Sequence, residues 1–480
     1  MEIKIRDFLE IPYDELERMN LEAKKNALER FPIEQVEAEY RQYLEKEKRA
    51  KAVTVCFSDI EGKLHSLDYD KKYFLKSPDN LTFDGSSIRG FSAIESSDLR
   101  LIPDWYSLRW LPSDVFGPGK ILMFAGICEQ DGTPHPCDMR SRLKTLLDEM
   151  YERDKTQYYL APELEGFVVE GRSAEQNFDE KTGFQVASKG GYYHTLPTCQ
   201  LKQFIDRAAE AQRAMGFENE KDHPEVAPSQ FELNYSYTEA ALAADQIQIY
   251  KLTCRQIAHD LDLTATFLPK PFVGINGSGM HTNISLARNG KNLFYDKRGK
   301  HYMSQLAWDF TSKIMNHAKE ICLILNSSVN SYRRLDPHYE APNQIRVSAT
   351  DRSAMIRLPI GNERSTRLEI RSAAPDSNPY LVAYTLLKTG LDGTKPAGDP
   401  SQKQSRQAIK ILPADIEEAI RYFKTSKFIT TILGDKFKDK YLGWKRAVAD
   451  RAPRNLGKII KNGEILYNHE VTNQVLWNSF

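Results

Sequence analysis

Residues 269–286 read PKPFVGINGSGMHTNISL, a glycine-rich loop that runs directly into a predicted β-strand. Gly277 and Gly279 let the backbone bend sharply and approach an anion with unobstructed N–H groups. Polar residues then alternate with apolar ones and so share one face of the strand: His281, Asn283 and Ser285. A phosphate-binding loop beside a cation ligand suggests a nucleotide-dependent enzyme. A plain hairpin turn is the alternative interpretation of the loop alone.

The composition excludes several classes of protein. The chain has 480 residues, enough for two or three domains, with 66 basic and 66 acidic residues. This balance argues against a general nucleic-acid or anionic-membrane binder. The N-terminus lacks the apolar core of a signal peptide, and no apolar run approaches the roughly 20 residues that span a bilayer. The six cysteines form no C-x-x-C pair, which indicates reduced thiols in a cytoplasmic protein.

The pattern of apolar residues divides the chain into three parts. Residues 14–50 predict one or two amphipathic helices, so we expect residues 1–50 to form a solvated or oligomer-facing appendage. Residues 51–138 are rich in strand-like runs punctuated by glycine and predict a small β-rich domain. Residues 139–480 alternate helical and strand-like segments and predict the larger domain. A polar stretch at 393–407 predicts a surface loop.

Strands are predicted at 158–169 and 366–371, and loops with strands at 267–286 and 345–358. The helical spacing predicts helices at 139–153, 201–215, 238–261, 306–325 and 379–391.

Four glutamates are candidate ligands of a hard divalent cation. Glu163 and Glu165 lie two residues apart in the predicted strand 158–169, on one face and among residues that look buried. Two buried carboxylates repel each other unless a cation neutralises them, and Mg²⁺ or Mn²⁺ prefers carboxylate oxygens. Glu225 and Glu232 are flanked by apolar residues or proline. On their own, these two are equally compatible with a site and with the surface.

Arginines cluster near a further carboxylate. Arg367, Glu369 and Arg371 share one face of the strand 366–371, either as a solvent face or as a carboxylate on a metal between two phosphate-binding guanidiniums. Other arginines nearby, including Arg334, Arg352 and Arg357, suggest a site for several negative charges. Asp84, on an Asp-Gly turn, and Asp98 are structural by default. The glycine loop lacks the Gly-Lys-Ser/Thr of a P-loop kinase.

Taken in order, these segments resemble type I glutamine synthetase. The matching motifs are DGSSI (84–88), PELE (162–165), KGGYY (189–193), EVAP (225–228), KPF through NGSGMH (270–281), NSYRRL (330–335), YEAP (339–342) and RLEIR (367–371). The resemblance implies an α+β fold, with a small N-terminal β-grasp-like domain and a large C-terminal α/β domain on a curved antiparallel sheet. It also implies a homo-oligomer, a dodecamer of two hexameric rings, with active sites between subunits.

The resemblance implies a role for each candidate residue. One Mg²⁺ or Mn²⁺ would bind Glu165, Glu225 and Glu232, and a second would bind Glu163, His281 and Glu369. Arg352, Arg357 and Ser285 would contact ATP, with Arg352 neutralising phosphate charge in catalysis. Glutamate would lie near Asn276, Gly277, Arg334 and Arg371, and ammonium near Tyr192, Asp98 and the base Asp84 of a neighbouring subunit. Glu340 would close the site on a flap.

The function that the resemblance implies is ATP-dependent ligation of ammonia to glutamate. A sister enzyme that joins glutamate to a polyamine or methylamine is the nearest alternative. It would share the metals and arginines but would enlarge or neutralise the ammonium pocket. A non-catalytic relative would have lost ligands, and all six candidate ligands are present. A metal-dependent hydrolase would explain the carboxylates but not the arginines.

Overall fold

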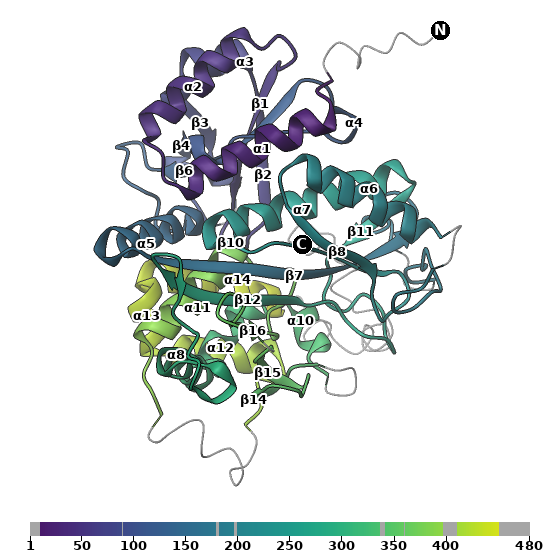
Figure 1. Ribbon diagram of the computed structural model, residues 1–480, viewed down its shortest axis with the longest axis vertical. Helices are drawn as coiled ribbons and strands as arrows, with labels where there is room; N and C mark the ends of the chain where they lie inside the picture. Colours follow the sequence, from purple (N-terminus) through teal and green to yellow (C-terminus); the bar gives the residue numbers. More distant parts are fainter. Residues whose placement is uncertain are drawn as a thin grey trace.

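The computed structural model describes residues 10–88, 90–178, 182–195, 199–336, 341–359, 361–396 and 410–450. Glu340, most of the predicted surface loop at 393–407 and the C-terminal segment 451–480 lie outside the described residues. Two sheets organise the chain. In Figure 1 the smaller sheet lies at the top, and the larger one crosses the middle of the molecule.

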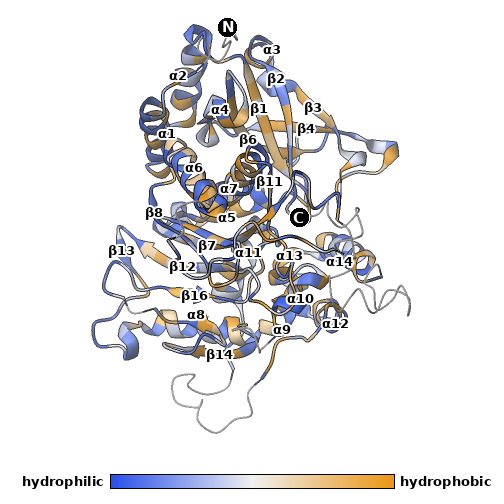
Figure 2. Ribbon diagram, turned by 90° about the vertical axis from the view of Figure 1, so that its right-hand side faces the viewer, coloured by the Kyte–Doolittle hydropathy of each residue, from blue (hydrophilic) through white to orange (hydrophobic). Residues whose placement is uncertain are grey.

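The smaller sheet has six strands in the order β2-β1-β6-β4-β3, with β5 paired to β6. Only the pairing of β1 with β6 is parallel. β1 is buried and mostly hydrophobic, whereas β2 beside it exposes alternate polar residues (Figure 2). The elements are β1 (Ala52–Ser58), β2 (Leu64–Asp70), α3 (Lys71–Lys76), β3 (Leu81–Asp84), β4 (Asp98–Pro103), β5 (Arg109–Trp110), α4 (Ser113–Phe116) and β6 (Lys120–Cys128).

The two N-terminal helices, α1 (Tyr13–Leu28) and α2 (Ile33–Lys46), exist as predicted, but they do not form an appendage. α1 contacts β5 of the small domain and α6 of the large domain. Buried Asn20 donates hydrogen bonds to the carbonyls of Trp110 (2.9 Å) and Ala214 (2.8 Å) and accepts one from Trp110 N–H (3.0 Å). α1 therefore joins the small domain to the large domain, because the amide of Asn20 forms hydrogen bonds with the backbone of both.

The larger sheet has ten strands, in the order β14-β15-β16-β12-β7-β9-β8, with β10 and β11 on β7 and β13 on β12. All of its pairings are antiparallel except that of β14 with β15. The strands are β7 (Thr156–Glu170), β8 (Asn219–Pro224), β9 (Gln230–Tyr235), β10 (Thr238–Glu239), β11 (Leu263–Thr266), β12 (Met280–Arg288), β13 (Lys291–Asn292), β14 (Gln344–Ser348), β15 (Ala354–Arg357) and β16 (Leu368–Ile370).

β7 is the strand on which the large sheet depends. Its first nine residues pair with β12, and its last residues pair with β9 and β11. The switch of partner falls at Glu163 to Glu165, so this short segment faces two strands that come from distant parts of the sequence. Helix α7 holds it in place, because the buried hydroxyl of Tyr250 donates to the carbonyl of Leu164 (2.9 Å).

The remaining helices belong to the large domain. They are α5 (Met139–Asp154), α6 (Gln200–Ala214), α7 (Ala240–Asp260), α8 (Gln305–Asn316), α9 (Ala318–Leu325), α10 (Val329–Arg334), α11 (Pro379–Asp392), α12 (Ile416–Thr425), α13 (Lys427–Leu433) and α14 (Asp435–Asp450). The predicted elements at 139–153, 158–169, 201–215, 238–261 and 379–391 are confirmed within a few residues. The predicted helix at 306–325 divides at His317, and the strand at 366–371 shortens to three residues.

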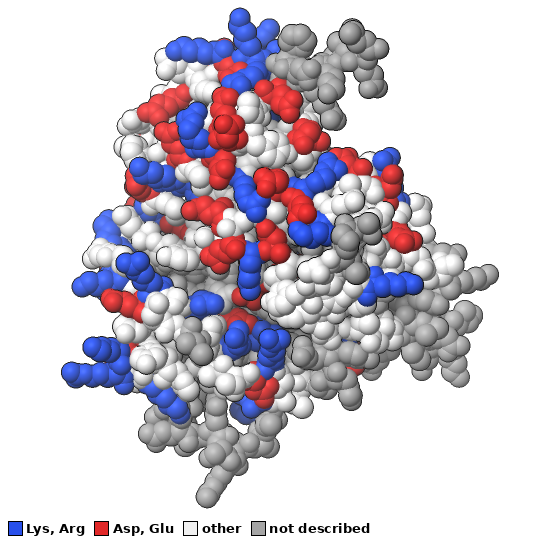
Figure 3. Space-filling view, turned by 45° about the vertical axis from the view of Figure 1, so that its right-hand side comes forward, with Lys and Arg blue, Asp and Glu red and all other residues white. Residues whose placement is uncertain are grey.

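Figure 3 shows basic and acidic side chains interspersed over the face that it presents. None of the helices within the described ranges combines the length and apolar character that a membrane crossing needs.

Candidate metal and substrate site

The first cluster of ligands lies across β7, β12 and β16. The strand register places His281 opposite Glu163 and Asn283 opposite Glu369. One ligand atom from each of Glu163, His281 and Glu369 lies within 4.8 Å of the others. Asn283 supports this cluster, since its amide donates to Glu163 (3.0 Å) and its oxygen accepts from Arg367 Nε (2.9 Å). The predicted second cation set is therefore brought together.

The second cluster lies across β8, β9 and the turn between them. Its members are His223, Glu225 and Glu232, whose ligand atoms also lie within 4.8 Å of one another. The set predicted for this cation is Glu165, Glu225 and Glu232. Glu165 lies directly opposite Glu232 in the ladder, but its carboxylate accepts hydrogen bonds from Gly279 N–H (2.7 Å) and Gln230 Nε2 (3.3 Å).

The electrostatics of these glutamates is that of crowded, buried negative charge. Burial, followed by the charges of Glu165, Glu163 and Glu225, raises the pKa of Glu232 well above its ordinary value. Burial also raises the pKa of Glu165. Burial opposes ionisation of Glu163 as well, but the hydrogen bond and charge of His281 outweigh it and bring its pKa to about 2. Oxygen-rich, carboxylate-dominated clusters of this kind fit divalent cations such as Mg²⁺ or Mn²⁺.

Glu369 is held differently from the other glutamates. Its side chain is almost fully buried and forms ion pairs with Arg357 (2.6 Å) and Arg371. Arg357 lies opposite Glu369 in the pairing of β15 with β16. Two guanidiniums thus converge on one carboxylate at the edge of the first cluster. They can turn to an anion when a cation shares the charge of Glu369.

Arg334 supplies a buried cation at the end of α10. Its guanidinium donates to the carbonyls of Arg371 (2.9 Å), Ala373 (3.2 Å) and Ser372 (3.3 Å). Burial lowers its pKa to about 10, so the group stays charged at neutral pH. Its charge interacts with that of Glu165, although the two side chains form no direct ion pair among the described residues. The backbone bonds fix its orientation toward the cavity that it lines.

These groups surround a single cavity of about 470 Å³. The candidate residues that line it are Glu163, Glu165, Tyr192, Glu225, Glu232, Asn276, Gly277, His281, Arg334, Arg352, Arg357 and Arg371. A cavity with carboxylates on one side and guanidiniums on another can hold a cation and an anion together.

The glycine loop has a role different from the one its sequence suggested. The N–H of Gly279 binds the protein's own carboxylate at Glu165. A Cβ on Gly279 would lie 2.4 Å from Arg334 Nη2 and 2.8 Å from His281 Nε2, and one on Gly277 would lie 2.4 Å from the Pro269 carbonyl. The glycines therefore allow close packing of the arginine, the histidine and the loop.

Four predicted residues among those described do not line the cavity; one is Glu369, which pairs with the lining residues Arg357 and Arg371. Asp84 and Asp98 face each other in the pairing of β3 with β4, on the exposed end of the small domain. Asp84 accepts hydrogen bonds from Ser86 N–H (2.9 Å), Ser86 Oγ (2.6 Å) and Ser87 Oγ (2.8 Å), which lower its pKa. Ser285 lies two residues beyond Asn283, on the same face of β12 as His281, but it does not line the cavity.

Sequence reasoning missed three polar residues that line the cavity: His223, Lys221 and Gln230. Lys221 and His223 alternate in the manner of a strand, but β8 is short and ends at a proline. Gln230 donates to Glu165, to the Gly277 carbonyl (3.1 Å) and to Ser278 Oγ (3.2 Å), a central position that no local motif announces.

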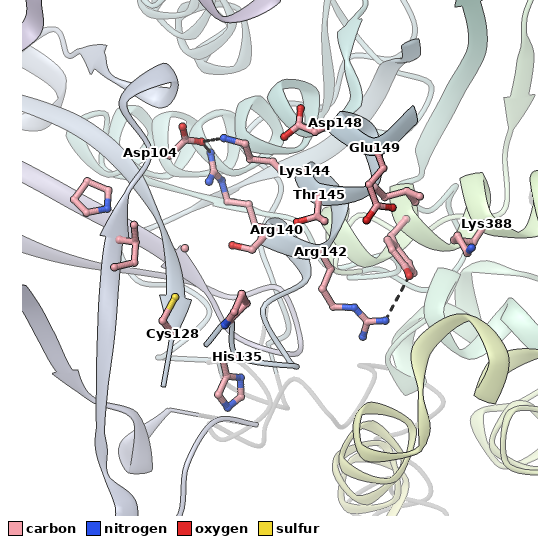
Figure 4. A pocket seen from close by; sticks show the side chains of 17 residues that line it. Asp104, Cys128, His135, Arg140, Arg142, Lys144, Thr145, Asp148, Glu149 and Lys388 are labelled. Atoms are coloured by element: carbon pink, nitrogen blue, oxygen red, sulfur yellow. Dashed lines mark hydrogen bonds and ion pairs between the residues drawn. The ribbon is translucent and has the colours of Figure 1, made fainter. Parts of the chain in front are cut away.

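A larger hollow of about 670 Å³ lies between the small domain, α5 and α11 (Figure 4). Several of its charges are already paired: Asp104 binds Arg140 (2.7 Å) and Lys144, and Arg140 also binds Asp245 (2.7 Å). Arg142 donates to the carbonyls of Leu433 (3.0 Å) and Ile432 (3.3 Å). This hollow is an ion-paired junction between elements, and it holds neither of the two candidate metal clusters.

Comparisons with known proteins agree with this architecture. A model of the glutamine synthetase β-grasp domain matches residues 49–129, and a model of the glutamine synthetase catalytic domain matches residues 136–458. Glutamine synthetases from Staphylococcus aureus and Staphylococcus epidermidis are 34% identical over 418 residues, which cover 83% of this chain and 91% of theirs.

Solved structures share the fold. The cryo-EM structure of Plasmodium falciparum glutamine synthetase has a TM-score of 0.78 at 22% identity and covers 88% of this chain and 98% of its own. The ligand-free structure of a protein called GmaS has a TM-score of 0.71 at 26% identity, covering 85% of this chain and 94% of its own. With both domain models matched in order and relatives 34% identical over most of its length, the chain belongs to the glutamine synthetase family.

Proposed function

We propose that the protein catalyses ATP-dependent ligation of ammonia to the γ-carboxylate of L-glutamate, through γ-glutamyl phosphate, to give glutamine, ADP and phosphate. The observation that carries this proposal is the pair of acidic clusters that share one cavity with Arg334, Arg352, Arg357 and Arg371. Family membership and the relatives named glutamine synthetase support it.

Two divalent cations, Mg²⁺ or Mn²⁺, would polarise the γ-phosphoryl group and neutralise its charge during transfer. Glu163, His281 and Glu369 would hold one of them. Glu225 and Glu232, with Glu165 beside them, would hold the other. The pKa of Glu232, raised by burial and by the neighbouring carboxylates, supports this assignment, because a bound cation offsets both effects.

The arginines would position the anions. Arg352 and Arg357 would bind phosphate oxygens, and Arg334 and Arg371 would bind the carboxylates of glutamate. Arg371 fits this role because its buried Nε has no hydrogen-bond partner among the described residues. Asn276 and Gly277 would approach the amino acid from the loop. Ser285 would contact the nucleotide farther along β12.

Ammonium would bind where Tyr192 and Glu225 meet, since a carboxylate beside an aromatic face attracts a cation. Deprotonation needs a further base, and Asp84 and Asp98 lie away from the cavity of their own chain. We infer that Asp84 of a neighbouring subunit completes the site, in a homo-oligomer of two hexameric rings. Its lowered pKa keeps the carboxylate ionised for ammonium. Glu340 would close the cavity and exclude water.

A second candidate is ligation of glutamate to a small organic amine. The rings of Tyr192 and Tyr193 stack with their centroids 3.7 Å apart, and each meets the ring of His223 edge-on. Tyr192 and His223 line the cavity. An aromatic wall of this kind also suits an alkylammonium ion. Similarity to GmaS is compatible with either acceptor.

An ATP-dependent assay with glutamate and either ammonium, methylamine, putrescine or hydroxylamine decides between the candidates. Ammonium is expected to give the highest kcat/KM. An equal or better rate with methylamine or putrescine would overturn ammonia as the acceptor. Absence of ATP hydrolysis with every acceptor would overturn the ligase itself.

The compartment is also part of the proposal. All six cysteines are free thiols, five of them buried, which suits a reducing compartment. We infer that the enzyme acts in the cytoplasm.

A further inference from the structure

His223 belongs to the same row of side chains as the acidic ligands. It lies directly opposite Glu232 in the pairing of β8 with β9, and Glu232 lies directly opposite Glu165 in the pairing of β9 with β7. Residues that face each other across an antiparallel ladder project from the same face of the sheet. The strand register therefore puts an imidazole at the end of a row that already holds two carboxylates.

The hydrogen bonding of His223 leaves one of its nitrogens free. The side chain is 9% exposed. Nδ1 lies 3.2 Å from the carbonyl oxygen of its neighbour Pro224, a contact in which Nδ1–H donates. Nε2 is buried and has no hydrogen-bond partner among the described residues. A backbone carbonyl on Nδ1–H fixes the tautomer with its lone pair on Nε2, which is the form that binds metals.

Aromatic packing does not account for this arrangement. Tyr192 and Tyr193 meet the ring of His223 edge-on, with centroids 5.8 Å and 4.9 Å away. These contacts fix the plane of the imidazole but offer no donor to Nε2. A phenylalanine would make the same contacts without leaving a buried polar atom unpaired, which costs about 1–3 kcal/mol.

We propose that His223 is a ligand, through Nε2, of the cation held by Glu225 and Glu232. This inference rests on the cation sites of the proposed function. One ring nitrogen of His223 lies within 4.8 Å of a carboxylate oxygen of both Glu225 and Glu232, and its Nδ1 lies 3.7 Å from Glu225 Oε1, so a small rotation of the ring is needed to present Nε2. The carboxylate of Glu165 is meanwhile held by Gly279 N–H and Gln230. The site is then a mixed nitrogen and oxygen site.

The proposal has a consequence for metal choice. Imidazole is a poor ligand for Mg²⁺ and a better one for first-row transition ions, among which Mn²⁺ binds most weakly. A histidine in this site therefore favours Mn²⁺ over Mg²⁺ there. Replacing it should reduce Mn²⁺ affinity more than Mg²⁺ affinity.

Pulsed EPR of the full-length protein loaded with Mn²⁺ tests the ligand directly, because a bound imidazole gives ¹⁴N modulation. His281 is the other candidate imidazole, so the measurement uses the His281→Ala variant. The His281→Ala variant is expected to bind Mn²⁺ and to keep the ¹⁴N modulation. The double variant His281→Ala/His223→Ala is expected to lose the modulation. A single-variant sample without modulation, or without bound Mn²⁺, would overturn the proposal. So would modulation that survives in the double variant.

Calorimetry on otherwise wild-type protein gives a second readout. His223→Ala is expected to weaken Mn²⁺ binding at one site by about tenfold or more and to leave Mg²⁺ binding nearly unchanged. His259→Ala, which removes an exposed histidine, is the matched control. Equal losses for both ions would contradict a nitrogen ligand. Wild-type protein that binds neither ion would instead refute the cation sites of the proposed function.

Discussion

Glu165 and Glu232 lie directly opposite each other on β7 and β9, and both carboxylates are buried. Like charges that face each other across a ladder destabilise a sheet. Burial raises the pKa of both carboxylates, and the charge of Glu165 raises that of Glu232 further. No lysine or arginine forms an ion pair with either carboxylate among the residues described here. The pair therefore favours a bound divalent cation over the metal-free state.

Replacing one of these carboxylates should separate folding from cation binding. We expect Glu232→Gln to raise the unfolding temperature of the metal-free protein, because it removes about 1 kcal/mol of repulsion. Mn²⁺ should raise the unfolding temperature of the variant less than it raises that of the wild type. Ligase activity of the variant should fall at least about tenfold. Thermal unfolding with and without Mn²⁺, together with turnover, measures all three effects.

Glu220→Gln is the control for this variant. Glu220 is an exposed carboxylate on the neighbouring strand β8, so its loss should change neither the Mn²⁺ effect nor activity. A Glu232→Gln protein that is stabilised by Mn²⁺ as strongly as the wild type would show that this carboxylate does not bind the ion.

Gly279→Ala should damage the site through packing alone. The new Cβ would lie within 3 Å of both Arg334 Nη2 and His281 Nε2, so one of these groups must move. We expect KM for glutamate to rise if Arg334 moves and Mn²⁺ affinity to fall if His281 moves. Steady-state kinetics and calorimetry distinguish the two.

The comparison for this variant is Gly443→Ala in α14, where a Cβ meets nothing within 4 Å. It should leave kinetics unchanged and stabilise the helix by about 0.5–1 kcal/mol. Unaltered glutamate kinetics and Mn²⁺ binding in Gly279→Ala would mean that the site tolerates a Cβ there.

Local pattern was enough to predict the strands that carry most of the site. β7 and β12 are long, and the two-residue spacing of Glu163 and Glu165 and of His281, Asn283 and Ser285 places each set on one face, as predicted. Glu369 was open to two interpretations from sequence. Its almost fully buried side chain excludes the solvent-facing one.

Pairing between distant strands could not be predicted in the same way. The place of His223 depends on the register of β8 against β9, which no residue near His223 specifies. The same reason explains Glu165, whose partners Gly279 and Gln230 come from two different segments. Asn20 shows a third limit, because a polar residue on an amphipathic helix reads as solvent-facing until its buried backbone partners are known.

Asn20→Ala should therefore destabilise the protein far more than its place in an N-terminal helix suggests. The substitution removes three hydrogen bonds and leaves the carbonyls of Trp110 and Ala214 without this partner. We expect a loss of about 2–4 kcal/mol in the free energy of unfolding. Glu22→Ala, at an exposed position of the same helix, should change it by less than about 0.5 kcal/mol. Equal unfolding midpoints for the two variants would show that α1 does not join the domains.

His135 should make the protein sensitive to acid. Burial, together with the nearby ammonium of Lys440, lowers its pKa from 6.5 to about 4, and its Nδ1 already accepts the N–H of Cys137 (3.1 Å). Above pH 6.5 the imidazole is neutral in the folded and unfolded states and costs nothing. Between pH 6.5 and 4 the unfolded chain binds a proton that the folded protein does not, so stability falls as the pH falls.

His135→Asn should remove this dependence, since an amide oxygen can accept the same N–H without titrating. The variant loses the edge-on contact with Phe91, so at pH 7.5 we expect it to be less stable by about 1 kcal/mol. Its disadvantage should shrink as the pH falls toward 4, because only the wild type carries the titrating imidazole. Unfolding midpoints measured from pH 7.5 to 4.5 give the comparison. Parallel curves for the two proteins would mean that His135 does not titrate differently on folding.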